Sequence, residues 1–329
     1  QTCGMGKDFY EKYEESREIF DKASELLGFD MKELCFENEK DINITEYTQP
    51  ALLTVSVAIL RVLEQKGIRP DVCAGLSLGE YCAMVASEVM SFEDAVKTVR
   101  QRGILMQEAV PLGVGAMCAV LGLDGETVNK VCQGVDDVYV ANYNCPGQIV
   151  ISGKAEAVEQ AAGLLKEAGA KRCMMLNVSG PFHSPLLREA GDKLAEVLKD
   201  VKLNDGFTIP YVTNVTAEYV NTTEEIRELL RKQVSSSVMW QQSVENMIAK
   251  GVDTFVEIGP GKTLAGFMKR INKEVRMVNI GSVEDLEKLL FLWQEETEER
   301  IAEDTVSVDG EIRSKDGLTY SRLVIGQNQ

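Results

Sequence analysis

The order of strand-like and helix-like stretches constrains the fold of this chain more than any other feature. In its C-terminal half, short apolar runs alternate with segments whose apolar residues recur at helical spacing. The expected strands are 209–215, 253–259 and 275–281, and the expected helices are 184–200, 222–234, 243–251 and 261–272. Strands that alternate with helices are typical of an α/β fold built on a mostly parallel sheet.

The stretch between residues 113 and 178 has a different order of elements. Its pattern predicts strands at 115–122, 138–144, 148–153 and 171–178, and helices at 124–133 and 154–170. The resulting order, βαββαβ, is that of a ferredoxin-like unit. We therefore expect a parallel-sheet, hydrolase-like α/β core that carries an inserted ferredoxin-like subdomain.

This insertion divides the chain of 329 residues into three parts. Residues 1–112 and 179–290 are expected to form the α/β catalytic core, and residues 113–178 the small subdomain. Residues 291–329 form a divergent tail, which is acidic at first and then alternates around two Asp-Gly turns. The second part of that tail is compatible with a β-hairpin.

The first part of the core is expected to contain a long helix. Residues 48–67 are apolar at helical spacing, Pro50 suits the first turn of a helix, and Gly67 suits its end. Another helix is expected after Ser91, which would be its N-cap. Between these helices, strand 69–75 and helix 77–90 meet at the sequence GLSLG.

The sequence GLSLG, residues 75–79, matches the G-x-S-x-G nucleophile elbow. In such an elbow the serine occupies a strained turn between a strand and a helix, which exposes its hydroxyl group. The N–H of the next residue is then free to stabilise an oxyanion at the start of the helix. Ser77 is therefore a candidate nucleophile and Leu78 a candidate oxyanion donor, and a chance match in a loop is the alternative.

A serine nucleophile needs a base, most often an imidazole. His183 is the only histidine of the chain, so a histidine that activates Ser77 has to be this one. It stands in the sequence NVSGPFHSPLL, where Gly180, Pro181 and Pro185 restrict the backbone. A lone histidine is more often structural than catalytic. The sequence alone does not decide whether the two side chains meet.

Composition argues against several classes of partner. A net charge of −17 disfavours nucleic acid. One histidine and the lack of any C-x-x-C pair disfavour a metal site. No apolar run reaches the roughly 18 residues that a membrane span requires. The eight scattered cysteines fit a reduced, cytoplasmic chain better than a disulfide scaffold.

Beyond these two motifs, the chain resembles the malonyl-CoA:acyl carrier protein transacylases. The matching segments follow the family's order and are GMGKDFYE, TQPALLT, GLSLGEYCA, RGILMQEAVP, ANYNCPGQIVISG, GPFHSPLL, PYVTNV and VMWQQSVENMIAKGVDTFVEIGPGKTL. Several motifs in one order make this resemblance specific. It implies the same α/β core with a ferredoxin-like insert.

The resemblance implies a role for each matching residue. Ser77 would accept the acyl group, and His183 would act as general base and acid, held by the backbone carbonyl of Gln233. Arg102 would grip the free carboxylate of the malonyl group, a task that suits a bidentate guanidinium.

Two further positions, Gln49 and Asn144, match residues that line the family's active site. For Asn144, a hydrogen bond within a turn is an equal alternative. The resemblance also places the family's opening strand, with a second oxyanion donor, upstream of Gln1.

The expected reaction transfers the malonyl group from malonyl-CoA to the phosphopantetheine thiol of acyl carrier protein, through a malonyl-serine, in fatty acid biosynthesis. No cofactor is expected, since the CoA thioester is itself a substrate. Because carrier proteins are acidic, Lys269 and Arg270 are the expected docking site, and a solvated helix face is the alternative. Three other functions stay open: a serine esterase or thioesterase of related fold, a trans-acting acyltransferase of polyketide synthesis, and an interaction protein that retains the fold.

Overall fold

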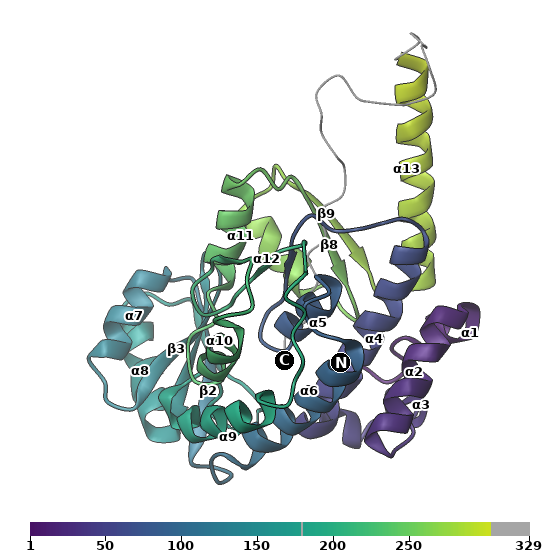
Figure 1. The fold of residues 1–329 in the computed structure, drawn as a ribbon. Helices are drawn as coiled ribbons and strands as arrows, with labels where there is room; N and C mark the ends of the chain where they lie inside the picture. Colours follow the sequence, from purple (N-terminus) through teal and green to yellow (C-terminus); the bar gives the residue numbers. More distant parts are fainter. Residues whose placement is uncertain (179, 304–329) are drawn as a thin grey trace.

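The chain begins with helices that surround one long, buried helix. The computed structural model describes residues 1–178 and 180–303, and Figure 1 shows their arrangement. The helices of this first part are α1 (Lys7–Lys12), α2 (Glu14–Leu27), α3 (Met31–Phe36), α4 (Thr45–Gln65), α5 (Gly79–Ala86) and α6 (Phe92–Glu108). Helices α1, α2 and α3 contact α4 from one side, and α6 contacts it from another. At the start of α6, the side chain of Ser91 accepts a hydrogen bond from the N–H of Asp94, as a cap does.

Helix α4 begins at Thr45, earlier than expected, so Pro50 lies inside the helix rather than in its first turn. A proline has no N–H to donate to the carbonyl four residues earlier. That carbonyl belongs to Glu46, and it accepts a hydrogen bond from Nη1 of Arg100 at 2.8 Å instead. The side chain of Arg100 on α6 therefore satisfies the carbonyl that Pro50 leaves without a backbone partner.

The strands of the core form two small sheets. They are β1 (Cys73–Ala74), β6 (Tyr211–Val212), β7 (Tyr219–Val220), β8 (Thr254–Ile258) and β9 (Arg276–Ile280). Strands β1 and β6 are parallel, as are β8 and β9, whereas β7 joins β6 in antiparallel direction. Strand β1 is shorter than the expected strand 69–75, because Pro70 has no ladder donor and Gly75 begins the turn towards α5.

The middle of the chain forms a four-stranded antiparallel sheet. Its elements are β2 (Gly115–Leu121), α7 (Gly125–Gln133), β3 (Val138–Cys145), β4 (Gln148–Lys154), α8 (Ala155–Glu167) and β5 (Arg172–Met175). The strand order is β3-β4-β2-β5, and all neighbouring pairs are antiparallel. Helices α7 and α8 cover the outer face of this sheet in Figure 1, and the buried residues between them form a hydrophobic cluster of their own.

The last part of the chain completes the core. Its helices are α9 (Arg188–Leu198), α10 (Ile226–Gln233), α11 (Trp240–Ala249), α12 (Thr263–Ile271) and α13 (Val283–Glu303). Helices α11 and α12 contact β3, so the core abuts the edge of the four-stranded sheet. The boundary expected between residues 290 and 291 falls inside α13, which runs through it. The expected hairpin lies in residues 304–329, outside the described residues.

The chain thus has an α/β fold. All eight cysteines are free, and six of them are buried. Within residues 1–178 and 180–303, no helix is both long enough and apolar enough to cross a lipid bilayer.

Candidate active site

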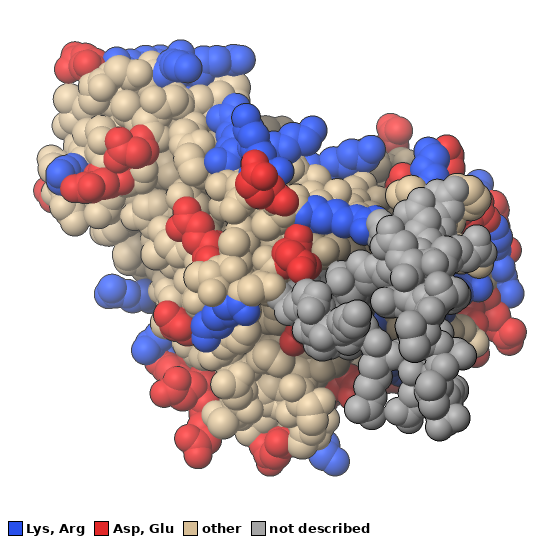
Figure 2. All heavy atoms as spheres, turned by 90° about the horizontal axis from the view of Figure 1, so that it is seen from above, with Lys and Arg blue, Asp and Glu red and all other residues tan. Residues whose placement is uncertain are grey.

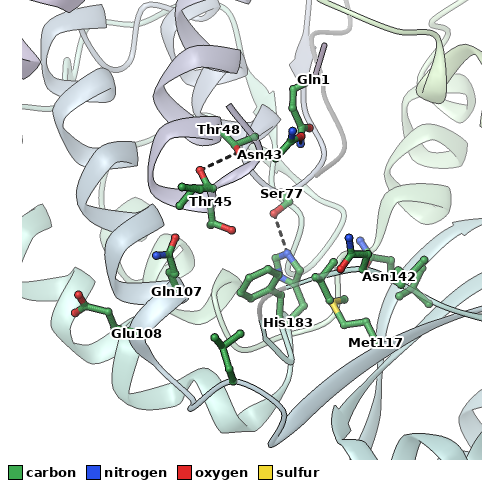
Figure 3. A pocket seen from close by; sticks show the side chains of 17 residues that line it. Gln1, Asn43, Thr45, Thr48, Ser77, Gln107, Glu108, Met117, Asn142 and His183 are labelled. Carbon is green, nitrogen blue, oxygen red and sulfur yellow. Dashed lines mark hydrogen bonds between the residues drawn. The ribbon is translucent and has the colours of Figure 1, made fainter. Parts of the chain in front are cut away.

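Ser77 occupies the sharp turn between β1 and α5. Its φ is 54°, in the left-handed region that non-glycine residues rarely adopt. A Cβ on Gly75 would stand 1.9 Å from the carbonyl carbon of Gly79, so the close approach of these two backbone segments requires glycine. The turn therefore holds the hydroxyl of Ser77 at the edge of a cavity (Figure 3).

His183 lies between β5 and α9, and its imidazole meets Ser77. The Oγ atom of Ser77 and the Nε2 atom of His183 are 2.8 Å apart (Figure 3). On the other side of the ring, Nδ1 is 2.9 Å from the backbone oxygen of Gln233. Because a carbonyl oxygen only accepts, Nδ1 carries the hydrogen, and Nε2 is left to accept from the hydroxyl. The φ of His183 is also 54°, and such strained residues cluster at functional sites.

Burial keeps this imidazole neutral. Desolvation, and then the positive charge of Arg102, lower the pKa of His183 to about 4, while backbone hydrogen bonds with Gln233 and Ser236 oppose the shift. At neutral pH the Nε2 atom is therefore unprotonated, which is the state that a general base requires.

Arg102, on α6, is fully buried behind Ser77. Its Nη2 donates to Ser77 Oγ at 3.1 Å and to Gln233 Oε1 at 3.0 Å. Its Nη1 donates to Gln49 Oε1 at 2.7 Å. Within the described part of the chain, each of these acceptors is a neutral oxygen, and Nε has no acceptor. A buried guanidinium in this state is suited to receive an anionic group.

Of two successive backbone N–H groups at the nucleophile, the first has an acceptor and the second has none among the described residues. The N–H of Ser77 donates to Asn214 Oδ1 at 2.7 Å, and Asn214 Nδ2 donates to the backbone oxygen of Gly75 at 2.6 Å. Leu78 is the N-cap residue of α5, and its own N–H donates to no acceptor among the described residues. A free N–H at a helix start, next to a nucleophile, is the arrangement of an oxyanion donor.

A cavity of about 590 Å³ opens in front of Ser77 and His183. The start of α4 and the end of α6 line one side, and the four-stranded sheet lines the other with Met117 and Asn142 (Figure 3). The volume lies in the usual range of small-molecule sites. The cavity therefore gives a small acyl group access to the Ser77–His183 pair from between the core and the four-stranded sheet.

Known proteins are similar to this chain in sequence over most of its length. A family described as the acyl transferase domain matches residues 1–300. The malonyl CoA-acyl carrier protein transacylase of Bacillus subtilis is 45% identical over 303 residues, which cover 91% of this chain and 95% of that protein. The chain belongs to the malonyl-CoA:acyl carrier protein transacylase family.

Solved structures of transacylases have the same fold. The crystal structure of the malonyl CoA-acyl carrier protein transacylase from Clostridium perfringens is similar with a TM-score of 0.88 and 44% identity, covering 92% of this chain and 96% of that one. A second similar structure is a malonyl-transacylase in complex with its type II PKS acyl-carrier protein. Its TM-score is 0.86 at 41% identity, with 89% of this chain and 96% of that one covered.

Five of the residues expected in a transacylase site form one hydrogen-bonded cluster. They are Ser77, His183, Gln233, Arg102 and Gln49. The sequence left open whether serine and histidine meet, and the structure brings them together across 106 positions. Their chemical roles remain predictions.

Gln49 and Asn144 were both expected to line the site. Both are buried and neither lines the cavity, whereas Asn142 does. The pairing of β3 with β4 shifts between Val140 and Asn142, and again between Tyr143 and Cys145. These bulges interrupt the alternation of side chains along the strand, so a motif match does not tell which asparagine faces the cavity.

Two residues of the cluster were not expected. One is Asn214, and the other is Glu80, whose Oε2 accepts from Gln233 Nε2 at 2.8 Å and from the N–H of Asn214 at 3.1 Å. Burial raises the pKa of Glu80 to about 7. A charged residue in the apolar run SLGEYCAMVA was the available signal, because a fully buried glutamate nearly always has partners. Lys269 and Arg270 lie outside the cavity, exposed in the last turn of α12.

Proposed function

We propose that this chain transfers the malonyl group of malonyl-CoA to the phosphopantetheine thiol of an acyl carrier protein, in fatty acid biosynthesis. One observation carries the proposal: the buried guanidinium of Arg102 lies 3.1 Å from the hydroxyl of Ser77. A simple ester has no group that could pair with such a cation, whereas a malonyl thioester ends in a carboxylate that can. The curated relatives, which are malonyl CoA-acyl carrier protein transacylases, support the same substrates.

In the first half-reaction, the hydroxyl of Ser77 attacks the thioester carbonyl carbon of malonyl-CoA while Nε2 of His183 takes its proton. The charge that develops on the carbonyl oxygen faces the N–H of Leu78. The carbon–sulfur bond then breaks, and His183 gives its proton to the CoA thiolate as it leaves. A malonyl ester remains on Ser77.

In the second half-reaction, the phosphopantetheine thiol gives its proton to His183, and its sulfur attacks the ester carbonyl. The bond to the serine oxygen breaks, and Ser77 recovers its proton from the imidazolium. Arg102 holds the malonyl carboxylate in both halves. The low pKa of His183 restores the neutral base at the end of each half.

The test is a covalent adduct. After mixing with malonyl-CoA, the intact protein is expected to gain about 86 Da, the mass of a malonyl group in place of one hydrogen, on the peptide that contains Ser77. The Ser77→Ala variant is expected to gain nothing, and His183→Ala to react far more slowly. Mass spectrometry of the protein and of its peptides measures both.

Other outcomes would support the competing functions. The lack of any adduct on the wild-type chain would favour an interaction protein that retains the fold. Release of malonate faster than transfer to carrier protein would favour an esterase or thioesterase. Transfer to a polyketide carrier protein, with none to a fatty acid carrier protein, would favour a trans-acting acyltransferase of polyketide synthesis.

We also propose that Lys269 and Arg270 belong to the docking surface for the carrier protein. Both are exposed at the end of α12, which contacts β3 at the edge of the four-stranded sheet. Figure 2 shows the face above α11 and α12, where Lys and Arg side chains gather although the chain carries a net charge of −17. A local basic patch on an acidic protein suits an acidic partner.

The finer description of the fold is part of the proposal. The antiparallel order β3-β4-β2-β5 and the separate hydrophobic cluster support a ferredoxin-like subdomain at 113–178. The nucleophile turn and the parallel pair β1–β6 support a hydrolase-like core formed by 1–112 and 179–290. Eight free cysteines support a cytoplasmic location.

A further inference from the structure

A buried carboxyl group lies behind the nucleophile turn, and no step of the proposed reaction uses it. Glu80, in the first turn of α5, has no exposed surface. Its Oε2 atom accepts from the side-chain amide of Gln233 at 2.8 Å and from the backbone N–H of Asn214 at 3.1 Å. The backbone N–H of Asn214 can only donate, so Oε2 is an acceptor, and it determines which end of the Gln233 amide turns towards it.

The amide of Gln233 stands between acceptors on one side and a donor on the other. Its Nε2 donates to Glu80 Oε2 and, at 2.9 Å, to the backbone oxygen of Ser77. Its Oε1 accepts from Nη2 of Arg102 at 3.0 Å. A flipped amide would set oxygen against two oxygens and an NH₂ group against a guanidinium. The neighbours therefore admit one orientation.

The guanidinium of Arg102 is held at both terminal nitrogens. Gln49 Oε1 accepts from Nη1, and Gln233 Oε1 accepts from Nη2, which also donates to Ser77. Without Gln233 Oε1, one end of this planar fork would lose the side chain that fixes it, and the fork could rotate away from the nucleophile.

We propose that Glu80 is a positioning residue, which fixes the direction of the Gln233 amide and through it holds Arg102 ready for a substrate carboxylate. The inference rests on the proposed function, because it takes the malonyl carboxylate as the group that Arg102 receives. The contacts run from Glu80, which touches no substrate, through Gln233 to Arg102, the cation that would select the substrate.

The acceptor, rather than the charge, is the property that this role requires. Burial raises the pKa of Glu80 to about 7, so both protonation states occur near neutral pH. A protonated carboxyl group still has an oxygen that accepts. The role therefore predicts that an amide at this position is tolerated and that a side chain of similar length without an oxygen is not.

The experiment compares Glu80→Gln with Glu80→Met on two acyl donors. Serine acylation is measured as kcat/KM for malonyl-CoA and for p-nitrophenyl acetate, a neutral ester that needs no carboxylate grip. For Glu80→Met we expect a loss of about 10- to 100-fold with malonyl-CoA, mostly in KM, and less than about threefold with the neutral ester. For Glu80→Gln we expect less than about threefold on both.

Glu257→Met is the matched control. Glu257 is also buried and accepts from the N–H groups of Leu264 and Ala265, outside the cluster. We expect this variant to melt at a lower temperature with an unchanged ratio of the two kcat/KM values.

Two results would overturn the proposal. One is an equal loss of kcat/KM on both acyl donors in a folded Glu80→Met protein. The other is a Glu80→Gln variant that loses kcat/KM for malonyl-CoA as selectively as Glu80→Met does. If Glu80→Met does not fold, Gln233→Met must show the selective loss, because it removes the amide and leaves the backbone carbonyl on His183. A wild-type chain without a malonyl adduct would instead refute the proposed function itself.

Discussion

At the scale of single residues, the protonation state of His183 controls the chemistry of the site. The ring is buried, donates from Nδ1 to a carbonyl and has the guanidinium of Arg102 nearby. Each imidazolium formed during the reaction therefore forms in a place that disfavours its charge. This favours rapid return of the proton to the leaving group.

Acylation of Ser77 is expected to stay constant as the pH falls from about 8 to about 5. It should decline only near pH 4, because the pKa of His183 is lowered to about 4 and a protonated Nε2 cannot take the serine proton. The measurement is rapid-quench acylation by malonyl-CoA across this range. A midpoint near 6.5, the ordinary value for imidazole, would contradict the effect of burial.

The replacement Arg102→Lys tests the grip on the carboxylate. Lysine keeps the charge but loses the planar fork, so we expect kcat/KM for malonyl-CoA to fall about 10- to 100-fold. The value for acetyl-CoA should change by less than about threefold. Arg100→Lys, on the same helix but bonded to Glu46 rather than to Ser77, is the control and should change neither. Equal losses on the two thioesters would argue against a carboxylate contact.

At the scale of elements, the turn between β1 and α5 requires its two ends, Gly75 and Gly79, to lie very close together. Gly75 has no room for a side chain, because a Cβ there would stand 1.9 Å from both the carbonyl carbon and the oxygen of Gly79. Asn214 then fixes the turn with its side-chain amide, which bonds the carbonyl of Gly75 and the N–H of Ser77. The position of the nucleophile thus depends on backbone packing as much as on its own side chain.

Gly75→Ala is expected to abolish the malonyl adduct, because the turn has to open to admit the methyl group. Gly163→Ala is the matched control. That residue lies in α8 with nothing within 4 Å of an added Cβ, so alanine should stabilise the helix by about 0.5–1 kcal/mol. Thermal unfolding and adduct formation measure both variants. Normal acylation in Gly75→Ala would show that the turn tolerates a side chain.

At the scale of the whole molecule, the site lies beside the four-stranded sheet. The nucleophile and the base come from the core, and the four-stranded sheet closes the other side of the cavity with Met117 and Asn142 (Figure 3). Helix α12 contacts this sheet through β3, so a partner that binds α12 also lies near the sheet. The surface charge near α12 therefore depends on how the folded chain brings α12 next to the sheet.

The double variant Lys269→Glu, Arg270→Glu tests the docking surface. We expect KM for carrier protein to rise about tenfold at low salt, with serine acylation by malonyl-CoA unchanged, because rim charges act on association. The control is Lys193→Glu on α9 with Lys199→Glu at its C-cap, and Figure 1 shows α9 at the lower edge of the molecule, below α12. Unchanged transfer in the first variant would remove these two residues from the docking surface.

Local sequence determined the elements and the two motifs of this protein. Periodicity of two or of about 3.6 residues depends on near neighbours, so the alternation of strands and helices could be predicted, as could the turn at Ser77. His183 could be singled out as the candidate base for a simpler reason, because the chain has no other histidine.

Only the tertiary structure decided which of these residues meet. Ser77 and His183 are 106 positions apart, and the bond from Gln233 to the backbone of Ser77 spans 156. No local pattern encodes such contacts, because they depend on how the core packs. The same holds for the amide network at Glu80 and for the bulges that turn Asn142, rather than Asn144, towards the cavity.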